Sequence, residues 1–203
     1  KAKDAAQAII DLGQYTLDSD YSNLFKLAGQ NSNEIILAVQ YKSGTRPIGT
    51  IGQLYNNGDG GWSSVVPTQN CVDNYEMSNG MTIDEAGSGY DATHPFHGRD
   101  PRMAMSILYP GCDWNDGVFN TLDENVNGKK NPNYPTNAAN ASKTALTWRK
   151  YLDPKSQYSD VWDTECSPIV FRYAEVLLTW AEAENELNGP SANVYAMIDK
   201  VRT

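Results

Sequence analysis

Residues that interrupt regular secondary structure are concentrated in the middle of this 203-residue chain. Most of the 16 glycines and 10 prolines, together with most of the asparagines, lie between Ser43 and Asn140. Glycine and asparagine tolerate positive φ and proline lacks a backbone donor, so this segment cannot form long helices or wide sheets. We therefore expect a loop-rich region over residues 43–146. Because long loops in compact domains are usually functional, we expect this region to carry the binding surface.

Helical periodicity appears at both ends of the chain. Near the N-terminus, apolar residues at i, i+3, i+4 and i+7 predict a helix over residues 1–12, followed by a glycine. Asp18 or Asp20 can cap a second helix that ends at Gly29. The sequence thus predicts a helical hairpin over residues 1–30.

The clearest helical pattern lies at the other end of the chain. A serine–proline pair at Ser167, typical of an N-cap and a first helical position, directly precedes apolar residues that follow helical spacing to Leu187. A Gly-Pro pair at Gly189 ends this run, and Ser191 can cap the next periodic segment. The resulting helical hairpin over residues 167–203 is the unit of tetratricopeptide arrays, although the chain shows no strict sequence repeat.

Four shorter segments complete the expected pattern. A continuous apolar stretch over residues 34–41 predicts a buried strand, and alternation over residues 147–152 predicts another. Thr68 can cap a helix that runs to about Met77, and Pro101 predicts a tight turn or a first helical turn. The expected fold class is mainly α, with tetratricopeptide-like helical hairpins, a long loop-rich insertion and a few short strands.

Charge and composition exclude several classes of function. The net charge of -9 and the scattering of only 16 basic residues argue against nucleic-acid binding, which needs clustered lysine and arginine. No apolar run reaches the length of a membrane span, and no signal-peptide pattern precedes the first helix. Cys71, Cys112 and Cys166 are odd in number and widely spaced, so we expect free, mostly buried thiols.

Patterns of catalytic residues are weak. His94 and His97 are the only histidines, and neither a nucleophile elbow, a phosphate-binding loop nor a third zinc ligand accompanies them. We interpret them as surface loop residues. Glu182, Glu184 and Glu186 are interpreted as the polar flank of a helix. We therefore predict no catalytic residue, no metal site and no cofactor.

One segment partly matches a calcium-binding loop. Asp123, Asn125, Asn127 and Gly128 follow the DxNxNG pattern with which such loops begin, but Tyr134 stands where the bidentate glutamate is required. Asn-Gly pairs are also common in ordinary turns. An ordinary turn is the favoured interpretation, and calcium binding is the alternative.

Aromatic residues in the loop-rich region lie beside amides and carboxylates. Sugars stack their C–H faces on aromatic rings, while their hydroxyl groups need hydrogen-bond donors and acceptors. For Trp62 and Trp114, the alternative is that each ring anchors a loop to the core. We predict a carbohydrate-binding site formed by Tyr55, Asn56, Asp59, Trp62 and Trp114.

Several motifs in a fixed order carry a family resemblance. The segment FRYAEVLLTWAEAENELNGPSANVYAMIDKVR, from Phe171 to Arg202, resembles the later portion of the SusD/RagB family of nutrient-binding outer-membrane lipoproteins. NEIILAVQY, PTQNCVDNYEMSNG, GRDPRMAMSIL and WRKYLD agree with that family in the same order. We therefore interpret residues 1–203 as a single region of this family, truncated at both ends.

The resemblance implies a non-enzymatic protein held at the outer membrane, outside the cell, by a lipid anchor that lies beyond this piece. It implies capture of oligosaccharides or polysaccharides, or of peptides in some members, and delivery to a SusC-like TonB-dependent transporter. Ligand contacts in the family lie in variable loops, so the five predicted contacts rest on residue chemistry alone. Arg172 and Glu175, three residues apart, are expected to have a structural role.

Two other functions fit part of the sequence. Helical-hairpin arrays commonly bind partners along a concave face, so a protein-interaction scaffold is the first alternative. A glycan-active hydrolase is the second, because two catalytic acids can come from distant positions. Retention by a polysaccharide would indicate a glycan-binding protein. Capture of a transporter without affinity for sugar would indicate a scaffold, and release of reducing sugar would indicate a hydrolase.

Overall fold

The computed structural model describes residues 1–202, which form two compact units. The helical unit contains residues 1–24, residues 28–40 and the chain from residue 167 on. The loop-rich unit contains residues 25–27 and 41–166. Segments from both ends of the chain thus fold into one unit, and the middle of the chain forms the other.

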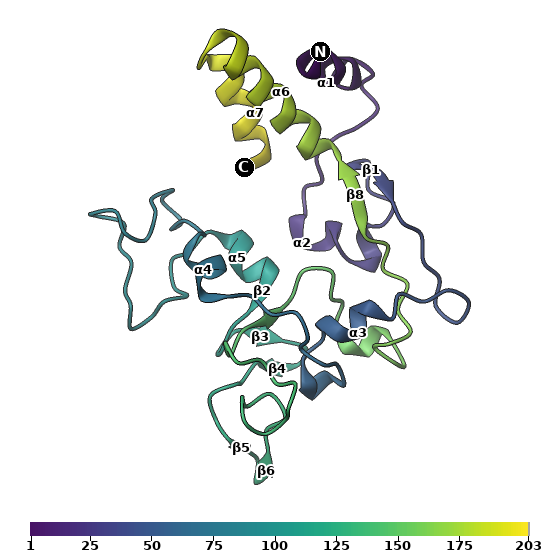
Figure 1. The fold of residues 1–203 in the computed structure, drawn as a ribbon, viewed down its shortest axis with the longest axis vertical. Coiled ribbons are helices and arrows are strands. Elements are labelled where there is room, and N and C mark those ends of the chain that lie inside the picture. Colours follow the sequence, from purple (N-terminus) through teal and green to yellow (C-terminus); the bar gives the residue numbers. More distant parts are fainter. Residues whose placement is uncertain (203) are drawn as a thin grey trace. The chain divides into compact units, whose positions relative to one another are not determined.

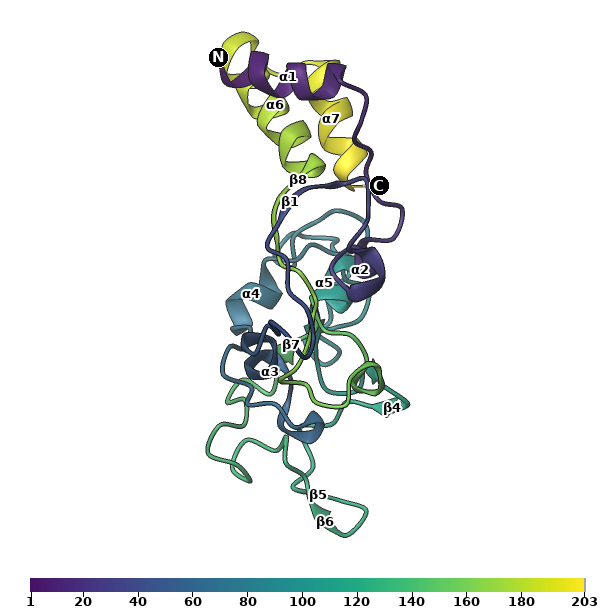
Figure 2. The ribbon, with the colours of Figure 1, turned by 90° about the vertical axis from the view of Figure 1, so that its right-hand side faces the viewer.

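The helical unit combines helices with one small antiparallel sheet. Its elements are α1 (Ala2–Asp11), α2 (Tyr21–Leu24), β1 (Ile35–Ala38), β8 (Ile169–Arg172), α6 (Tyr173–Asn188) and α7 (Ala192–Arg202), and the 3-10 helix η1 (Leu27–Gly29) follows α2. Figures 1 and 2 show α6 and α7 side by side, with α1 lying across α6. The helices bury a common apolar core, whose members are Ala6, Val176 and Trp180, surrounded by Ile9, Ile10, Ile36, Phe171, Tyr173 and Met197.

The hairpin predicted over residues 1–30 is not present, because the partner of α1 is α6. Asp20 caps α2 as predicted, with its Oδ1 accepting from the backbone nitrogen of Asn23 at 3.0 Å, but α2 ends after one turn. The next residue, Phe25, is buried in the loop-rich unit, where its ring packs edge-on against Tyr151. Packing of that side chain therefore competes with continuation of the helix.

The long C-terminal helix begins later than the serine–proline pair predicts. Residues Ile169–Arg172 form strand β8, which pairs antiparallel with β1, and α6 starts at Tyr173. The sequence of β8 is rich in β-branched and aromatic residues, and the backbone of β1 supplies its hydrogen-bond partners. The pairing between distant strands therefore overrides the local helical signal.

Helices α6 and α7 form a hairpin near the end of the chain. Gly189 follows α6 with φ 79°, a conformation that favours glycine. Ser191 Oγ then accepts a hydrogen bond from Val194 N at 3.3 Å and caps α7. The turn chemistry read from the sequence fixes this joint.

Glu34 joins the strand pair to the start of α6. Its side chain is buried, with Oε1 accepting from the Arg172 guanidinium and Oε2 from Asp18 N at 2.7 Å. Its carbonyl accepts from Tyr173 N, the first residue of α6, at 2.8 Å. The structural role predicted for Arg172 thus involves Glu34, because Arg172 ends a strand and does not share a helix turn with Glu175.

The loop-rich unit contains short elements separated by long loops. Its elements are α3 (Thr50–Leu54), η2 (Asn57–Asp59), α4 (Gln69–Asp73), α5 (Pro101–Ser106), β2 (Ile107–Leu108), β3 (Asp113–Trp114), β4 (Gly117–Val118), β5 (Asn125–Val126), β6 (Lys129–Lys130), β7 (Thr147–Trp148) and η3 (Lys155–Gln157). The strands form three antiparallel pairs, β2 with β7, β3 with β4 and β5 with β6. The expected class, helical with a few short strands and long loops, is confirmed.

Two side-chain caps begin short helices in this unit, and the one at Thr68 was predicted. Thr68 Oγ1 accepts from Cys71 N at 3.2 Å, but α4 ends at Asp73, before the predicted end near Met77. Asp100 Oδ1 accepts from Arg102 N at 2.8 Å in front of the N1 proline of α5. Local cap chemistry therefore predicts where these helices start better than where they end.

The segment that partly matches a calcium loop forms a β-hairpin. Strands β5 and β6 are joined by Asn127 and Gly128, both with positive φ, which is the geometry of a type I′ turn. Within residues 1–202, no group of three or more His, Cys, Asp or Glu side chains is arranged to hold a metal ion. The type I′ turn is the geometry that the ordinary-turn interpretation predicts.

The three cysteines differ in accessibility. Cys71 is exposed, whereas Cys112 and Cys166 are buried, and all three are free thiols. Burial raises the pKa of the Cys166 thiol to about 12.

Within residues 1–202, no helix combines the length and apolar character that crossing a membrane requires.

We predict that only Cys71 reacts rapidly with a thiol reagent such as DTNB at pH 8. The thiolate is the reactive form, and a thiol with a raised pKa stays protonated until the pH approaches that pKa. The native chain should release one equivalent of chromophore, and the other two should appear after guanidinium is added. Rapid reaction of all three thiols in the native chain would contradict the burial of Cys112 and Cys166.

We further predict that Glu34→Ala lowers the free energy of unfolding by about 3 kcal/mol, because it leaves the Arg172 guanidinium and Asp18 N without this acceptor. Urea unfolding followed by far-ultraviolet circular dichroism measures the change. Glu186→Ala removes an exposed carboxylate from α6 and should change stability by less than roughly 0.5 kcal/mol. Equal unfolding midpoints for the two variants would show that Glu34 does not hold the unit together.

Candidate functional site

The loop that follows α3 carries four of the five predicted binding residues. Its first residue, Tyr55, is fully buried and its hydroxyl donates to the carbonyl of Asp153 at 2.7 Å. Burial, followed by the nearby carboxylate of Asp153, raises the pKa of the Tyr55 hydroxyl. The prediction that the Tyr55 ring contacts a ligand is therefore wrong for this structure, and Tyr55 anchors the loop in the core.

Asp59 contacts two of the other predicted residues, Asn56 and Trp114, and also Asn115. Its Oδ2 accepts from Asn56 Nδ2 at 2.6 Å and from Trp114 Nε1 at 2.5 Å, while its Oδ1 accepts from Asn115 Nδ2 at 3.0 Å. Its backbone nitrogen donates to Asn56 Oδ1 at 3.1 Å. Asp59 is only 8% exposed, so these donors stabilise the carboxylate in place of water. Residues far apart in the sequence are thereby held together.

A cavity of about 430 Å³ lies next to this cluster. Its wall combines one indole ring with many amide side chains and a few apolar ones. The lining residues are Asn56, Gly58, Asp59, Trp114, Asn115, Val118, Phe119, Asn120, Val126, Lys129, Lys130, Asn131, Pro132 and Asn133. Of these, Asn56, Asp59 and Trp114 were predicted. The other polar lining residues were not predicted. The high asparagine content of residues 115–140 is the sequence signal that could have indicated them.

Hydrogen bonds hold the asparagine-rich wall in place. Asn131 is buried, and its Nδ2 donates to the carbonyls of Asn120 at 3.0 Å and Asp123 at 2.9 Å. Asn133 Oδ1 accepts from Gly58 N at 2.9 Å, which ties this wall to the Asp59 loop. The cavity is therefore built from loops that are fixed to one another.

Trp62 lies outside the cavity lining and forms a separate aromatic pair with Trp162. The Trp62 side chain is 52% exposed, and the two ring centroids are 4.6 Å apart at an interplanar angle of 63°. Trp162 Nε1 donates to the carbonyl of Gly60 at 3.1 Å, so this pair also rests on the Asp59 loop. Sequence analysis did not single out Trp162, although Asp160 and Asp163 lie on either side of it.

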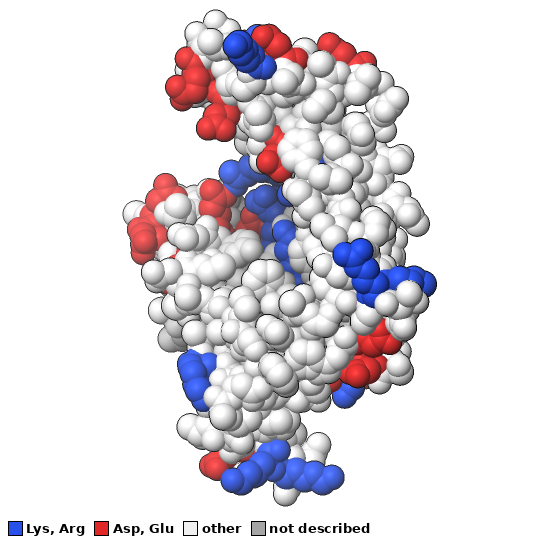
Figure 3. Space-filling model, turned by 45° about the vertical axis from the view of Figure 1, so that its right-hand side comes forward, with Lys and Arg blue, Asp and Glu red and all other residues white. Residues whose placement is uncertain are grey.

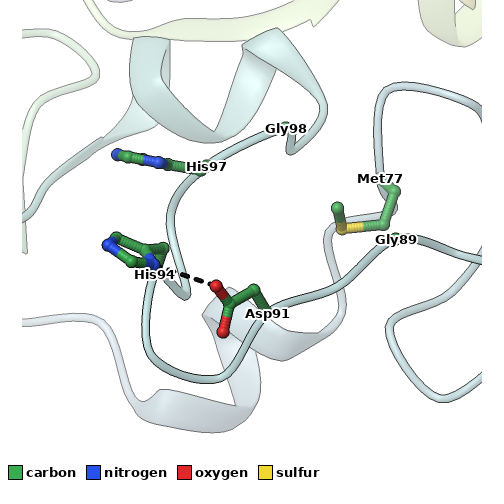
Figure 4. Close-up of a pocket in the computed structure, with 6 residues that line it drawn as sticks. All are labelled: Met77, Gly89, Asp91, His94, His97 and Gly98. Carbon is green, nitrogen blue, oxygen red and sulfur yellow. Dashed lines mark hydrogen bonds and ion pairs between the residues drawn. The ribbon is translucent and has the colours of Figure 1, made fainter.

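A second, smaller pocket of about 260 Å³ contains both histidines. Figure 4 shows the rings of His94 and His97 one above the other, with Asp91 pointing toward His94; the centroids are 5.2 Å apart. Hydrogen bonds from Thr93, then from His94, hold the pKa of the Asp91 carboxyl below its usual value. His94 and Asp91 are largely exposed, and no nucleophile or further metal ligand lines the pocket, whose other members are Met77, Gly89 and Gly98. The interpretation as surface loop residues is confirmed.

Several known proteins are similar to this chain in sequence and in fold. A model of the SusD family matches residues 33–203. The SusD-like protein P25 of Formosa agariphila is 28% identical over 220 residues, which cover 96% of this chain and 36% of that protein. A SusD-like carbohydrate binding protein of Bacteroides fragilis superposes with a TM-score of 0.79 at 27% identity, covering 98% of this chain and 38% of the other. This chain thus spans little more than a third of the length of either relative.

A further solved structure supports the fold alone. A second SusD-like protein of Bacteroides fragilis superposes with a TM-score of 0.71 at 22% identity, covering 97% of this chain and 41% of the other. The arrangement of helices and short strands is therefore retained where most residues have changed.

We predict that Gly52→Ala displaces the Trp162 ring and lowers the free energy of unfolding by about 1–3 kcal/mol. A Cβ atom at Gly52 would lie 2.4 Å from that ring, closer than van der Waals contact allows. Tryptophan fluorescence and chemical unfolding measure both effects. Gly49→Ala is the matched control, because its Cβ would come no closer than 3.7 Å to the Trp162 carbonyl. Identical spectra and stabilities for the two variants would contradict the close packing of Gly52 against Trp162.

Proposed function

The chain belongs to the SusD family, and from this membership we propose that it binds carbohydrate and contributes the binding surface through its loop-rich unit. The observation that carries the proposal is the composition of the larger cavity. A flat indole ring and several amide side chains line one space of about 430 Å³, which is large enough for one or two sugar rings. Amides both donate and accept hydrogen bonds, as sugar hydroxyl groups require.

Preorganisation of the cavity supports binding. Asp59 fixes the orientation of the Trp114 ring through its Nε1, and Arg149 lies over that ring with its guanidinium carbon 5.9 Å from the centroid. Ordering a wall before the ligand arrives removes an entropy cost from the binding step. The site can therefore bind a flexible ligand with few contacts.

The exposed pair of Trp62 and Trp162 supplies a second contact on the same unit. An exposed ring offers an apolar face on which the C–H face of a sugar can stack. We propose that a glycan of several sugar units contacts both this pair and the cavity. The proposal therefore includes Trp62 as a ligand contact and leaves out Tyr55.

Family membership supports the wider setting of the proposal. We propose that the whole protein is held by a lipid anchor on the outside of the outer membrane and passes glycan to a SusC-like TonB-dependent transporter. We also propose that it is not an enzyme, since glycan capture and transfer need no bond cleavage. A glycan-active hydrolase would release reducing sugar from a bound polysaccharide, and a protein-interaction scaffold would capture the transporter without any affinity for sugar.

We predict that Trp62→Ala weakens binding of a retained polysaccharide about tenfold, because truncating a ring that contacts ligand removes a main source of binding energy. Affinity gel electrophoresis identifies the ligand, and calorimetry measures the change. Trp114→Ala should have at least the same effect, with melting temperature recorded because this change also removes a donor to Asp59. Tyr195→Ala removes an exposed ring from the helical unit and is the control.

Two results would overturn this proposal. If no polysaccharide added to the gel slows the migration of the chain, the proposed function is wrong. If Trp62→Ala and Trp114→Ala both bind a confirmed ligand as tightly as the parent chain, the function stands and the assigned site is wrong.

A further inference from the structure

Two lysines line the cavity, and we propose that they select glycans carrying an acidic substituent, a carboxylate or a sulfate group. Lys129 and Lys130 form strand β6 and both contribute to the cavity wall. The inference rests on the proposed function, because it names the class of carbohydrate that the same cavity binds. Ammonium groups form charge-assisted hydrogen bonds with anionic oxygens, which are stronger than bonds between neutral groups.

The hairpin register directs one of the lysines toward the cavity. Lys129 pairs with Val126 across β5 and β6, and residues directly opposite each other in an antiparallel pair lie on the same face. Val126 also lines the cavity, so the face that carries Val126 and Lys129 is the one turned to it. Lys130 lies at the end of β6, next to Asn131, which is buried in the cavity wall.

The charge of these lysines is not neutralised within the chain. Among residues 1–202, neither ammonium group forms an ion pair or hydrogen bond, and both residues are exposed. The acidic residue of the lining, Asp59, is buried and accepts hydrogen bonds from three side chains. Asp123 and Glu124 precede β5 but do not line the cavity. The accessible charge of the lining is therefore positive.

This local charge contrasts with the whole chain, whose net charge is -9. In Figure 3, a basic group stands at the lower end of the view, the end at which Figure 1 places β5 and β6. An acidic chain repels anionic ligands at long range, but salt screens such repulsion within about 10 Å. A short-range contact with the two ammonium groups therefore decides whether an acidic sugar binds.

An alternative role for lysines on a hairpin is to prevent edge-to-edge pairing of strands. That role requires charge along the free edge and gives no reason for a lysine to share the cavity face with Val126. It also predicts no dependence of glycan binding on charge. Measuring whether glycan binding depends on the charge of the glycan therefore distinguishes the two roles.

The test compares matched acidic and neutral polysaccharides by affinity gel electrophoresis, followed by calorimetry. Polygalacturonate with its methyl-esterified form tests carboxylate, and carrageenan with agarose tests sulfate. We expect at least about tenfold tighter binding of the acidic member in one pair. The double variant Lys129→Gln with Lys130→Gln should lose about tenfold of that affinity, with the larger share from Lys129, and Arg at both positions should restore it. Lys200→Gln, an exposed lysine of α7, is the control for the single Lys129→Gln variant, because each of these changes removes one positive charge.

Four outcomes contradict the inference. Retention of neutral polysaccharides only, or acidic binding that the double Gln variant leaves unchanged, overturns the selectivity and leaves the proposed function standing. Equal loss from Lys200→Gln would show that net charge and not the cavity is responsible. Absence of retention on every polysaccharide, neutral and acidic, overturns the proposed function itself.

Discussion

Asp59 accepts hydrogen bonds from three side chains that come from two distant loops, and the candidate site depends on this buried carboxylate. The loop-rich unit has strands of only two residues, so backbone ladders contribute little to its order. A unit of this kind must satisfy its buried backbone groups in another way. Side-chain carboxylates and amides take that role, and they explain why asparagine is abundant in this part of the chain.

Asparagine is suited to this task because one side chain offers a donor and an acceptor together. Asn131 shows the consequence: it is buried, it donates to two backbone carbonyls through Nδ2, and its Oδ1 accepts from Asn133 N at 3.0 Å. An amide that faces solvent can also donate hydrogen bonds to sugar hydroxyl groups and accept hydrogen bonds from them. One residue type therefore supports the loops and lines the cavity, which joins the stability of the unit to its proposed function.

The sequence predicted features that depend on local chemistry. The caps by Asp20, Thr68 and Ser191 and the joint at Gly189 all formed, because each needs only neighbouring residues. The predicted start of α6 was wrong, because strand β8 forms there and pairs with β1, which lies over a hundred positions away in the sequence. Within the candidate site, amide-rich composition indicated the loops that line the larger cavity. It could not show that the Tyr55 ring turns inward or that Trp162 meets Trp62, because both depend on tertiary packing.

The division of the chain into two units fits a binding protein whose ligands vary. The helical unit depends on an apolar core and on the buried Glu34, so most changes there cost stability. The cavity wall depends on a few fixed donors and acceptors, and exposed positions such as Lys129 contact no other charged group in the part of the chain that the structure describes. Under the proposed function, substitution at such a position would change which sugar is favoured without disturbing Asp59 or its donors. A stable frame with an adjustable lining would then let a shared fold recognise chemically different glycans.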